Sequence, residues 1–415
     1  MIEDVYALAV EVWRSEQVME ARAVVEKMYE ADPNAASEPA RDRIPADVEE
    51  YAFAAAQAAV TDPYRPQFQW FNAWKWTHGD VAVPSGRYGT DNPDNLYRYT
   101  AIGPGMSYRI TGKLSAHPPV AYTFSLYSGN FAETNLIRTI GIVANKDLQA
   151  DAEGNFTITI DPQPANGRVN HIQSADDAAT LAVRETLGDW KTEMPAKLTI
   201  ERTDDLASPP PLTRQELAER AARILKEGAP IWALKFQHDS YEKLPFNQPQ
   251  PIMSSAKRLG GLVTQSSSHG RFAIAEDEAY IVRVDPFDAD YLGFQLADVW
   301  MVSADYVDRL GCMNNFQAIP DADGHYTYVI SRVDPGVHNW LDATGLDTGG
   351  TTIRFQGLKD TSIDHSNAFE AKVVKIAQLK DVLPPETVWV TPEQRAQQLA
   401  DRRAVYERRK AALGK

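Results

Sequence analysis

The sequence predicts a mainly β protein with two jelly-roll-like antiparallel β-sandwich units and helical N- and C-terminal segments. Runs of β-branched and aromatic residues separated by Gly, Asn, Asp and Pro fill most of the chain. One such block, residues 122–160, matches residues 292–330 without a gap. Apolar residues at helical spacing are confined to three shorter stretches.

The first segment, residues 1–66, is predicted to be helical. Val5, Leu8 and Val12 recur at helical spacing, as do Val24 and Met28. A proline at position 45 opens a second helical stretch at 46–60.

The first β-sandwich unit is expected over residues 67–207. It begins with an aromatic-rich link at 68–76 that fits neither a helix nor a strand. Residues 208–260 are expected to form a linker and a helix, which Thr213 caps and Gly228 ends. The strand patterns of the first unit lie at 97–100, 108–114, 121–127, 156–160 and 197–201.

The second β-sandwich unit is expected over residues 261–385, and a C-terminal helix over 386–415, with its pattern at 392–413. The basic residues of this helix are interpreted as a solvated face. The strand patterns of the second unit lie at 279–284, 291–302, 326–331 and 351–356, and the basic residues are Arg402, Arg403, Arg408, Arg409 and Lys410.

A duplication is the simplest explanation of the internal match, which superposes Phe124 on Phe294 and Leu126 on Leu296. The turn at 151–154 lies over the turn at 321–324. Two unrelated hairpins that share an Asp-x-x-Gly turn remain the alternative. The second of these turns is interpreted as a hairpin and not as a calcium loop, because the other positions lack oxygen ligands.

Composition restricts the partners and the compartment. The 415 residues are 43% hydrophobic, which suffices for two sizeable cores, and the net charge of −15 would repel nucleic acid and acidic membranes. No export signal and no run of about 18 apolar residues is visible. Cys312, the single cysteine, is expected in the core and fits a reducing compartment, so a cytoplasmic location is predicted.

No motif for a metal or cofactor can be read locally. The eight histidines are scattered, and neither a His-x-His pair, a Walker loop nor a dinucleotide fingerprint is present. We therefore expect no cofactor, although distant residues could still assemble a metal site. The Ser-x-x-Lys pattern at Ser254 to Lys257 lacks its companion motifs and is interpreted as helix capping.

Three stretches carry candidate catalytic residues. In the serine-rich run just before the predicted strands of the second unit, His269 is a candidate general base and Arg271 a candidate anion-binding residue, the alternative being a solvated turn. Asp298 falls on the face of Phe294 and Leu296, so it is either a buried acid of raised pKa or a solvent-facing strand end.

The third stretch combines a base, a stacking surface and an acid after an Asp-Pro-Gly turn. His338 is a candidate catalytic residue, and Trp340 and Asp342 are candidate substrate-binding residues. Trp190 is the counterpart of Trp340 in the first unit, which suggests a shared packing role for these two side chains. Tyr291 is a further candidate for the wall of a substrate pocket.

The stretches 334–342, 351–355 and 184–190 resemble the bacterial family 1214 of domains of unknown function. The resemblance covers the two strand-rich regions and not the helical ends. It implies a jelly-roll-like β-sandwich, and by association a role near the degradation of steroids, terpenoids or aromatics. It carries no catalytic assignment.

These observations lead to two hypotheses. The first is a metal-independent hydrolase or lyase that acts on an apolar steroid, terpenoid or aromatic substrate in a pocket between the two units, since Trp and Tyr are abundant near polar loops. The second is a non-catalytic ligand-binding or assembly protein whose helical ends pack in a homo-oligomer. The enzyme is the leading hypothesis, and the binding or assembly protein is the alternative.

Overall fold

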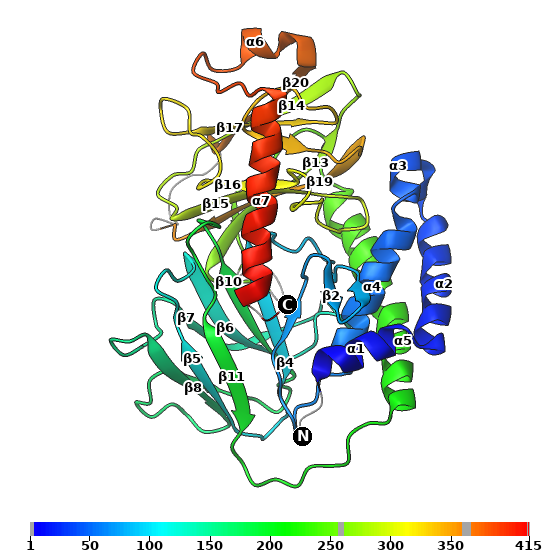
Figure 1. The fold of residues 1–415 in the computed structure, drawn as a ribbon, viewed down its shortest axis with the longest axis vertical. Coiled ribbons are helices and arrows are strands. Elements are labelled where there is room, and N and C mark those ends of the chain that lie inside the picture. Colours follow the sequence, from blue (N-terminus) through cyan, green and yellow to red (C-terminus); the bar gives the residue numbers. More distant parts are fainter. Residues whose placement is uncertain (1–3, 256–260, 359–366, 413, 415) are drawn as a thin grey trace.

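Two β units stack along the long axis of the molecule, and a layer of helices covers one side of them (Figure 1). The structure is a computed structural model that describes residues 4–255, 261–358, 367–412 and 414. The prediction of a strand-rich protein with helices at both ends of the chain is confirmed in this general form. No helix within the described ranges has the length and apolar content needed to span a bilayer.

The helical layer combines the N-terminal segment with the helix predicted within residues 208–260. The alanine-rich helix Ile44–Ala59 is buried on almost all sides, so that neighbouring helices approach it closely. The Asp4 carboxylate caps the first helix, and a Thr213–Glu216 capping box begins the fifth. The helices are α1 (Val5–Trp13), α2 (Glu16–Glu30), α3 (Glu38–Arg41), α4 (Ile44–Ala59) and α5 (Arg214–Pro230).

The first β unit consists of a five-stranded sheet, β1-β4-β10-β6-β7, and a four-stranded sheet, β11-β5-β8-β9. Phe124, Leu126 and Ile158 belong to the apolar core of this unit. Its strands are β1 (Gln69–Phe71), β4 (Asn95–Ala101), β5 (Tyr108–Lys113), β6 (Ala121–Tyr127), β7 (Thr139–Ala144), β8 (Asn155–Asp161), β9 (His171–Gln173), β10 (Thr180–Thr186) and β11 (Lys197–Arg202), and a separate hairpin joins β2 (Trp76–His78) to β3 (Val81–Val83).

The second unit has the corresponding sheets, β12-β13-β19-β15-β16 and β18-β17-β14-β20. Phe294, Leu296 and Ile330 belong to its core. Its strands are β12 (Met253–Ser254), β13 (Gln265–Ala273), β14 (Glu278–Val284), β15 (Tyr291–Ala297), β16 (Cys312–Asn314), β17 (Tyr326–Ser331), β18 (Trp340–Asp342), β19 (Thr348–Gln356) and β20 (Phe369–Lys375).

The two five-stranded sheets have the same internal order, with β4, β10, β6 and β7 in the places of β13, β19, β15 and β16. Thr186 on β10 and Gln356 on β19 are 170 residues apart and hydrogen-bond to each other at 2.8 Å. Corresponding strands of the two units therefore approach each other where the five-stranded sheets meet. The turns at 151–154 and 321–324 are also alike, since Gly154 and Gly324 both have positive φ, as a hairpin turn requires.

Two features of the helices differ from the prediction. The helix after Thr213 does not end at Gly228, because α5 reaches Pro230 and a π-helix, Ile231–Tyr241, continues it. The C-terminal helix α7 (Pro392–Ala412) lies along both units (Figure 1) and does not present all of its basic residues to solvent. Arg402 and Arg409 are buried over the ring of Trp190, at 4.5 and 4.2 Å from its centroid.

Candidate functional site

A cavity of about 180 Å³ lies between the two β units, where corresponding strands face each other. From the first unit, β4 contributes Asn95, Tyr97 and Tyr99, and from the second unit, β13 contributes Gln265, Ser267 and His269. These two sets occupy the same places in the two sheets, since β4 and β13 correspond. The strands beside them add one arginine each, Arg184 on β10 and Arg354 on β19.

The two arginines are buried beside the cavity, with 8% of Arg184 and 7% of Arg354 exposed. Arg184 donates to the Tyr127 hydroxyl at 2.5 Å, and Arg354 donates to the carbonyl oxygen of Thr90 at 2.6 Å. Arg354 also donates to the side-chain oxygen of Gln295. Within the described ranges neither guanidinium forms an ion pair, so both positive charges face the cavity without a carboxylate partner.

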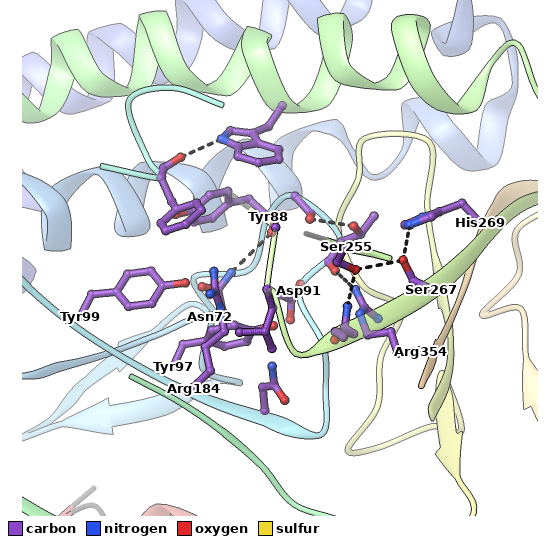
Figure 2. A pocket seen from close by; sticks show the side chains of 18 residues that line it. Asn72, Tyr88, Asp91, Tyr97, Tyr99, Arg184, Ser255, Ser267, His269 and Arg354 are labelled. Carbon is purple, nitrogen blue, oxygen red and sulfur yellow. Dashed lines mark hydrogen bonds between the residues drawn. The ribbon is translucent and has the colours of Figure 1, made fainter. Parts of the chain in front are cut away.

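A chain of hydrogen-bonding side chains leads from the helical layer to the cavity. The Tyr241 hydroxyl is 2.5 Å from Nδ1 of His269, and Nε2 of the same ring is 3.1 Å from Oγ of Ser267. Ser267 lies in turn 3.4 Å from Oγ of Ser255. Figure 2 shows His269, Ser267 and Ser255 in series on one side of the cavity and Tyr97, Tyr99 and Arg184 on the other.

Tyr241 can leave the imidazole in the form that a general base needs. Its hydroxyl is also 2.9 Å from Oγ1 of Thr352, to which it can donate while it accepts from the Nδ1–H of His269. In that tautomer, Nε2 carries a lone pair directed at the Ser267 hydroxyl.

Asp91 is a buried carboxyl group in the wall of the cavity, between the two groups of side chains in Figure 2. Burial raises its pKa to about 7, against the opposing effect of the Arg87 guanidinium. Neither carboxylate oxygen accepts a hydrogen bond of normal geometry within the described residues. An acid with this pKa can exchange a proton near neutral pH.

The π-helix Ile231–Tyr241 brings two aromatic side chains to the site. Near the start of this helix, Trp232 lines the cavity and donates from Nε1 to the carbonyl oxygen of Phe131 at 2.7 Å. At its end, the Tyr241 hydroxyl hydrogen-bonds with Nδ1 of His269. Gly89 has a positive φ, and a β-carbon there would lie 3.0 Å from the Trp232 ring, so glycine permits this close approach. π-Helical segments are rare and frequently occur at functional sites.

A second hollow of about 200 Å³ adjoins the cavity, and Ser267 and His269 line both spaces. Its other lining residues include the apolar side chains of Leu244, Pro251 and Met253. We call this hollow the apolar chamber. His269 therefore stands between the cavity and the apolar chamber.

Of the residues proposed from the sequence, only His269 lines the cavity. Arg271 lies on the same strand, but its guanidinium covers the Phe246 ring at 3.9 Å and donates to the carbonyl oxygen of Glu242. Tyr291 is buried between the units, where its hydroxyl donates to Asp94 at 2.7 Å. The lysine of the Ser-x-x-Lys pattern, Lys257, lies outside the described residues, whereas Ser255 lines the cavity.

Asp298 is a buried acid just beyond the end of β15. Its carboxylate accepts from the backbone N–H groups of Trp300 and Val302 at 2.9 and 3.0 Å, and Arg43 lies 3.7 Å away. Burial raises the pKa of Asp298. Asp298 is therefore a buried acid of raised pKa and not a solvent-facing strand end. It does not line the cavity.

His338, Trp340 and Asp342 lie elsewhere in the second unit. His338 lines a hollow of about 20 Å³, which has room for water but not for a substrate, and burial lowers its pKa. Trp340 lies under Arg395 of α7, 5.0 Å from its ring centroid, and Asp342 pairs with Arg309 at 2.8 Å. The three residues do not share a site with His269.

The cavity also contains residues that were not selected from the sequence, namely Arg184, Arg354 and Asp91, with Tyr241 behind them. They come from four distant segments, and none belongs to a recognisable local motif. The sequence does contain one signal for the two arginines. Arg184 and Arg354 have the same spacing as Phe124 and Phe294, so a longer comparison of the two halves would have paired them.

Among residues 4–255, 261–358 and 367–412, no three His, Cys, Asp or Glu side chains gather as a metal site.

The chain matches no family model and no curated protein. A solved structure of an uncharacterized protein from Burkholderia cenocepacia is 26% identical, with a TM-score of 0.73 over 89% of this chain and 100% of that chain. The VPA0106 protein from Vibrio parahaemolyticus is 11% identical, with a TM-score of 0.41 over 80% of this chain and 98% of that chain. Salicylate 1,2-dioxygenase from Pseudoaminobacter salicylatoxidans is 9% identical, with a TM-score of 0.18 over 75% and 77% of the two chains. The last two likenesses carry no argument, and the first indicates a shared fold without an activity.

Proposed function

We propose that the protein is a metal-independent small-molecule enzyme, hydrolase or lyase in type, and that its active site is the cavity between the two β units. The observation that carries this proposal is the chain from Tyr241 through His269 to Ser267 at the cavity wall. A tyrosine that orients an imidazole, which in turn faces a hydroxyl, is an arrangement suited to general base catalysis.

His269 acts as the base in this proposal, on Ser267 or on a bound molecule in its place. Asp91 faces the same space and supplies a second group that exchanges protons near neutral pH. A base and an acid in one site suit reactions that need both. The aromatic side chains of Trp232, Phe131 and Tyr88 provide walls for an apolar or aromatic substrate.

We further propose that the two β units are diverged copies of one jelly-roll-like unit. The matching order of their five-stranded sheets supports this. At corresponding places, the first unit has Tyr97 and Tyr99, and the second has Ser267 and His269. In this account one copy carries the acid–base groups and the other supplies the aromatic wall of the same cavity.

The test begins with a thermal-shift screen of the full chain against aromatic acids, terpenoids and steroids, followed by product analysis for each molecule that stabilises the fold. For a converted substrate, His269→Ala and Ser267→Ala should each lower kcat/KM by about a hundredfold or more. His117→Ala, at an exposed histidine outside the site, should leave the rate unchanged. Loss of turnover in His338→Ala but not in His269→Ala would contradict the proposed site.

The alternative function is non-catalytic binding of a small molecule in the same cavity. The observation that favours it is the pair of buried arginines, because an anion site needs charge but no proton transfer. Binding without conversion, and equal affinity in wild type and His269→Ala, would support this alternative over the enzyme.

A further inference from the structure

We propose that Arg184 and Arg354 form a carboxylate-binding site, so that the substrate is an organic acid whose apolar part occupies the chamber beyond His269. This inference rests on the proposed function, because it names the class of substrate for the same cavity.

The charges beside the cavity are not balanced by the described residues. Two guanidinium groups that are more than nine-tenths buried face the cavity, and among the residues that the structure describes neither forms an ion pair with a carboxylate. Asp91, which lines the same cavity, has a pKa of about 7 and lies next to Arg87, which already pairs with Glu50 at 2.5 Å. Burying unpaired charge is strongly unfavourable, so a bound anion would offset a large cost here.

Both arginines are held in place before any ligand binds. The Arg184 guanidinium lies near the rings of Tyr127 and Phe131, at 5.4 and 5.2 Å from their centroids, and donates to the Tyr127 hydroxyl. Arg354 is fixed by Gln295 and by the Thr90 carbonyl. A planar guanidinium offers two parallel N–H groups to a carboxylate, and a fixed guanidinium loses little entropy on binding one.

The apolar chamber indicates what the carboxylate is attached to. Ser267 and His269 line both the cavity and the chamber, so a molecule with its acid group at the arginines and its apolar part among Leu244, Pro251 and Met253 passes the imidazole. An inorganic anion would leave the chamber empty. The geometry therefore favours an acid with an aromatic or aliphatic tail.

The first experiment compares ligands on the unmodified full chain by isothermal titration. Benzoate should bind at least about tenfold more tightly than benzamide, which has the same shape without the charge. Inorganic phosphate should bind more weakly than benzoate. Equal binding of benzoate and benzamide, or stronger binding of phosphate, would overturn the inference without requiring any variant to fold.

The second experiment assigns the two parts of the site. Arg184→Gln and Arg354→Gln should each weaken benzoate binding about tenfold or more, whereas Arg109→Gln, at an exposed arginine of β5, should not. Met253→Ala and Leu244→Ala should weaken 4-phenylbutyrate binding several-fold and leave benzoate binding unchanged. If 4-phenylbutyrate and benzoate respond alike to both chamber variants, the chamber does not hold the tail.

The readout separates this inference from the proposed function, because binding is measured without turnover. Selective carboxylate binding with no conversion of any bound acid would support the inference and contradict the enzyme. Conversion of neutral molecules that depends on His269, with no preference for acids, would support the enzyme and contradict the inference.

Discussion

At the scale of single residues, the cavity differs from an ordinary protein interior in its buried polar groups. Arg184, Arg354 and Asp91 are all more than nine-tenths buried, and none of them belongs to an ion pair among the described residues. Buried charges in proteins are usually paired, and exceptions concentrate at functional sites. The measurable consequence is clearest for Asp91, whose pKa is shifted in a known direction.

Replacing Asp91 with Asn should change how stability depends on pH. In the unfolded chain the carboxyl ionises near its ordinary pKa of 3.8, whereas in the folded chain it keeps its proton up to about pH 7. The folded state therefore binds more protons between these values, and stability falls as the pH rises through this window. Asp91→Asn cannot ionise, so it should exceed wild type in stability at pH 8, by up to a few kcal/mol as an order of magnitude, and match it near pH 4.

Urea unfolding at pH 4, 6 and 8 measures this effect as the difference in the free energy of unfolding between Asp91→Asn and wild type. The difference isolates Asp91 from Asp47 and Asp298, whose pKa values burial also raises. Asp176→Asn, at an exposed aspartate, should give no such trend. If the free energies of unfolding of Asp91→Asn and wild type differ by the same amount at all three pH values, Asp91 does not keep its proton in the folded state.

At the scale of elements, the junction between α5 and the π-helix positions the site. Its backbone runs close to the loop after β6, where Tyr51 donates to the carbonyl oxygen of Ala132 at 3.0 Å. Gly228 lies at this crossing, and a β-carbon there would be 2.0 Å from the Ala132 oxygen. The glycine permits close packing of a continuing helix instead of ending it.

Gly228→Ala should therefore destabilise the protein, although alanine favours an isolated helix by about 1 kcal/mol relative to glycine. The added methyl group would force the helix and the loop apart, at a cost of about 1–3 kcal/mol. Thermal unfolding of the variant should show a lowered Tm, while Lys226→Ala, at an exposed position of the same helix, should change the Tm little. A raised Tm for Gly228→Ala would mean that helix propensity outweighs the contact.

The same elements illustrate how far sequence reasoning reaches. Strands β6 and β17 begin and end at their predicted residues, because period-two alternation and flanking turn residues are local signals. The end at Gly228 was predicted wrongly, because close approach to a distant loop leaves no local signal. The sequence likewise predicts a solvated face for Arg402 and Arg409, and this prediction is wrong because their stacking on Trp190 is a tertiary contact.

The candidate site was predictable only in part. His269 was selected because hydroxyl, imidazole and guanidinium groups crowd one short stretch. Its partner Tyr241 lies 28 residues earlier, at the end of an unexpected π-helix. The opposite wall of the cavity comes from the first β unit, and a sequence pattern does not show which faces of two sheets pack together.

At the scale of the whole molecule, a polar interface joins the two β units. Asp94 of the first unit is its centre, since its carboxylate accepts from Tyr291 at 2.7 Å and from Asn314 at 2.9 Å, both in the second unit. It also accepts from Nε1 of Trp190 at 2.7 Å. Helix α7 braces both units, with Arg395 over Trp340 and Arg409 over Trp190, in agreement with a shared packing role for the two tryptophans.

Asp94→Ala should weaken this interface more than an ordinary surface substitution would. Tyr291 and Trp190 would lose the acceptor of a buried hydrogen bond, and each such loss costs about 1–3 kcal/mol. Asn314 retains the carbonyl oxygens of Leu187 and Gly188. Burial raises the pKa of Asp94, so removing the carboxylate also relieves part of its own cost, and a net loss of about 2–4 kcal/mol is expected.

Urea unfolding of Asp94→Ala, Tyr291→Phe and the double variant measures the coupling between the two side chains. Among the described residues, Asp94→Ala leaves the Tyr291 hydroxyl, as a donor, with only a longer contact to Oδ1 of Asn92, at 3.4 Å. Because Tyr291→Phe removes this donor, the double variant should lose less stability than the sum of the single losses. Strictly additive losses would show that Asp94 and Tyr291 act independently. Since the same two sheets enclose the cavity, a loosened interface should also weaken ligand binding, and the coupling measured in this cycle is then part of what holds the two walls of the site together.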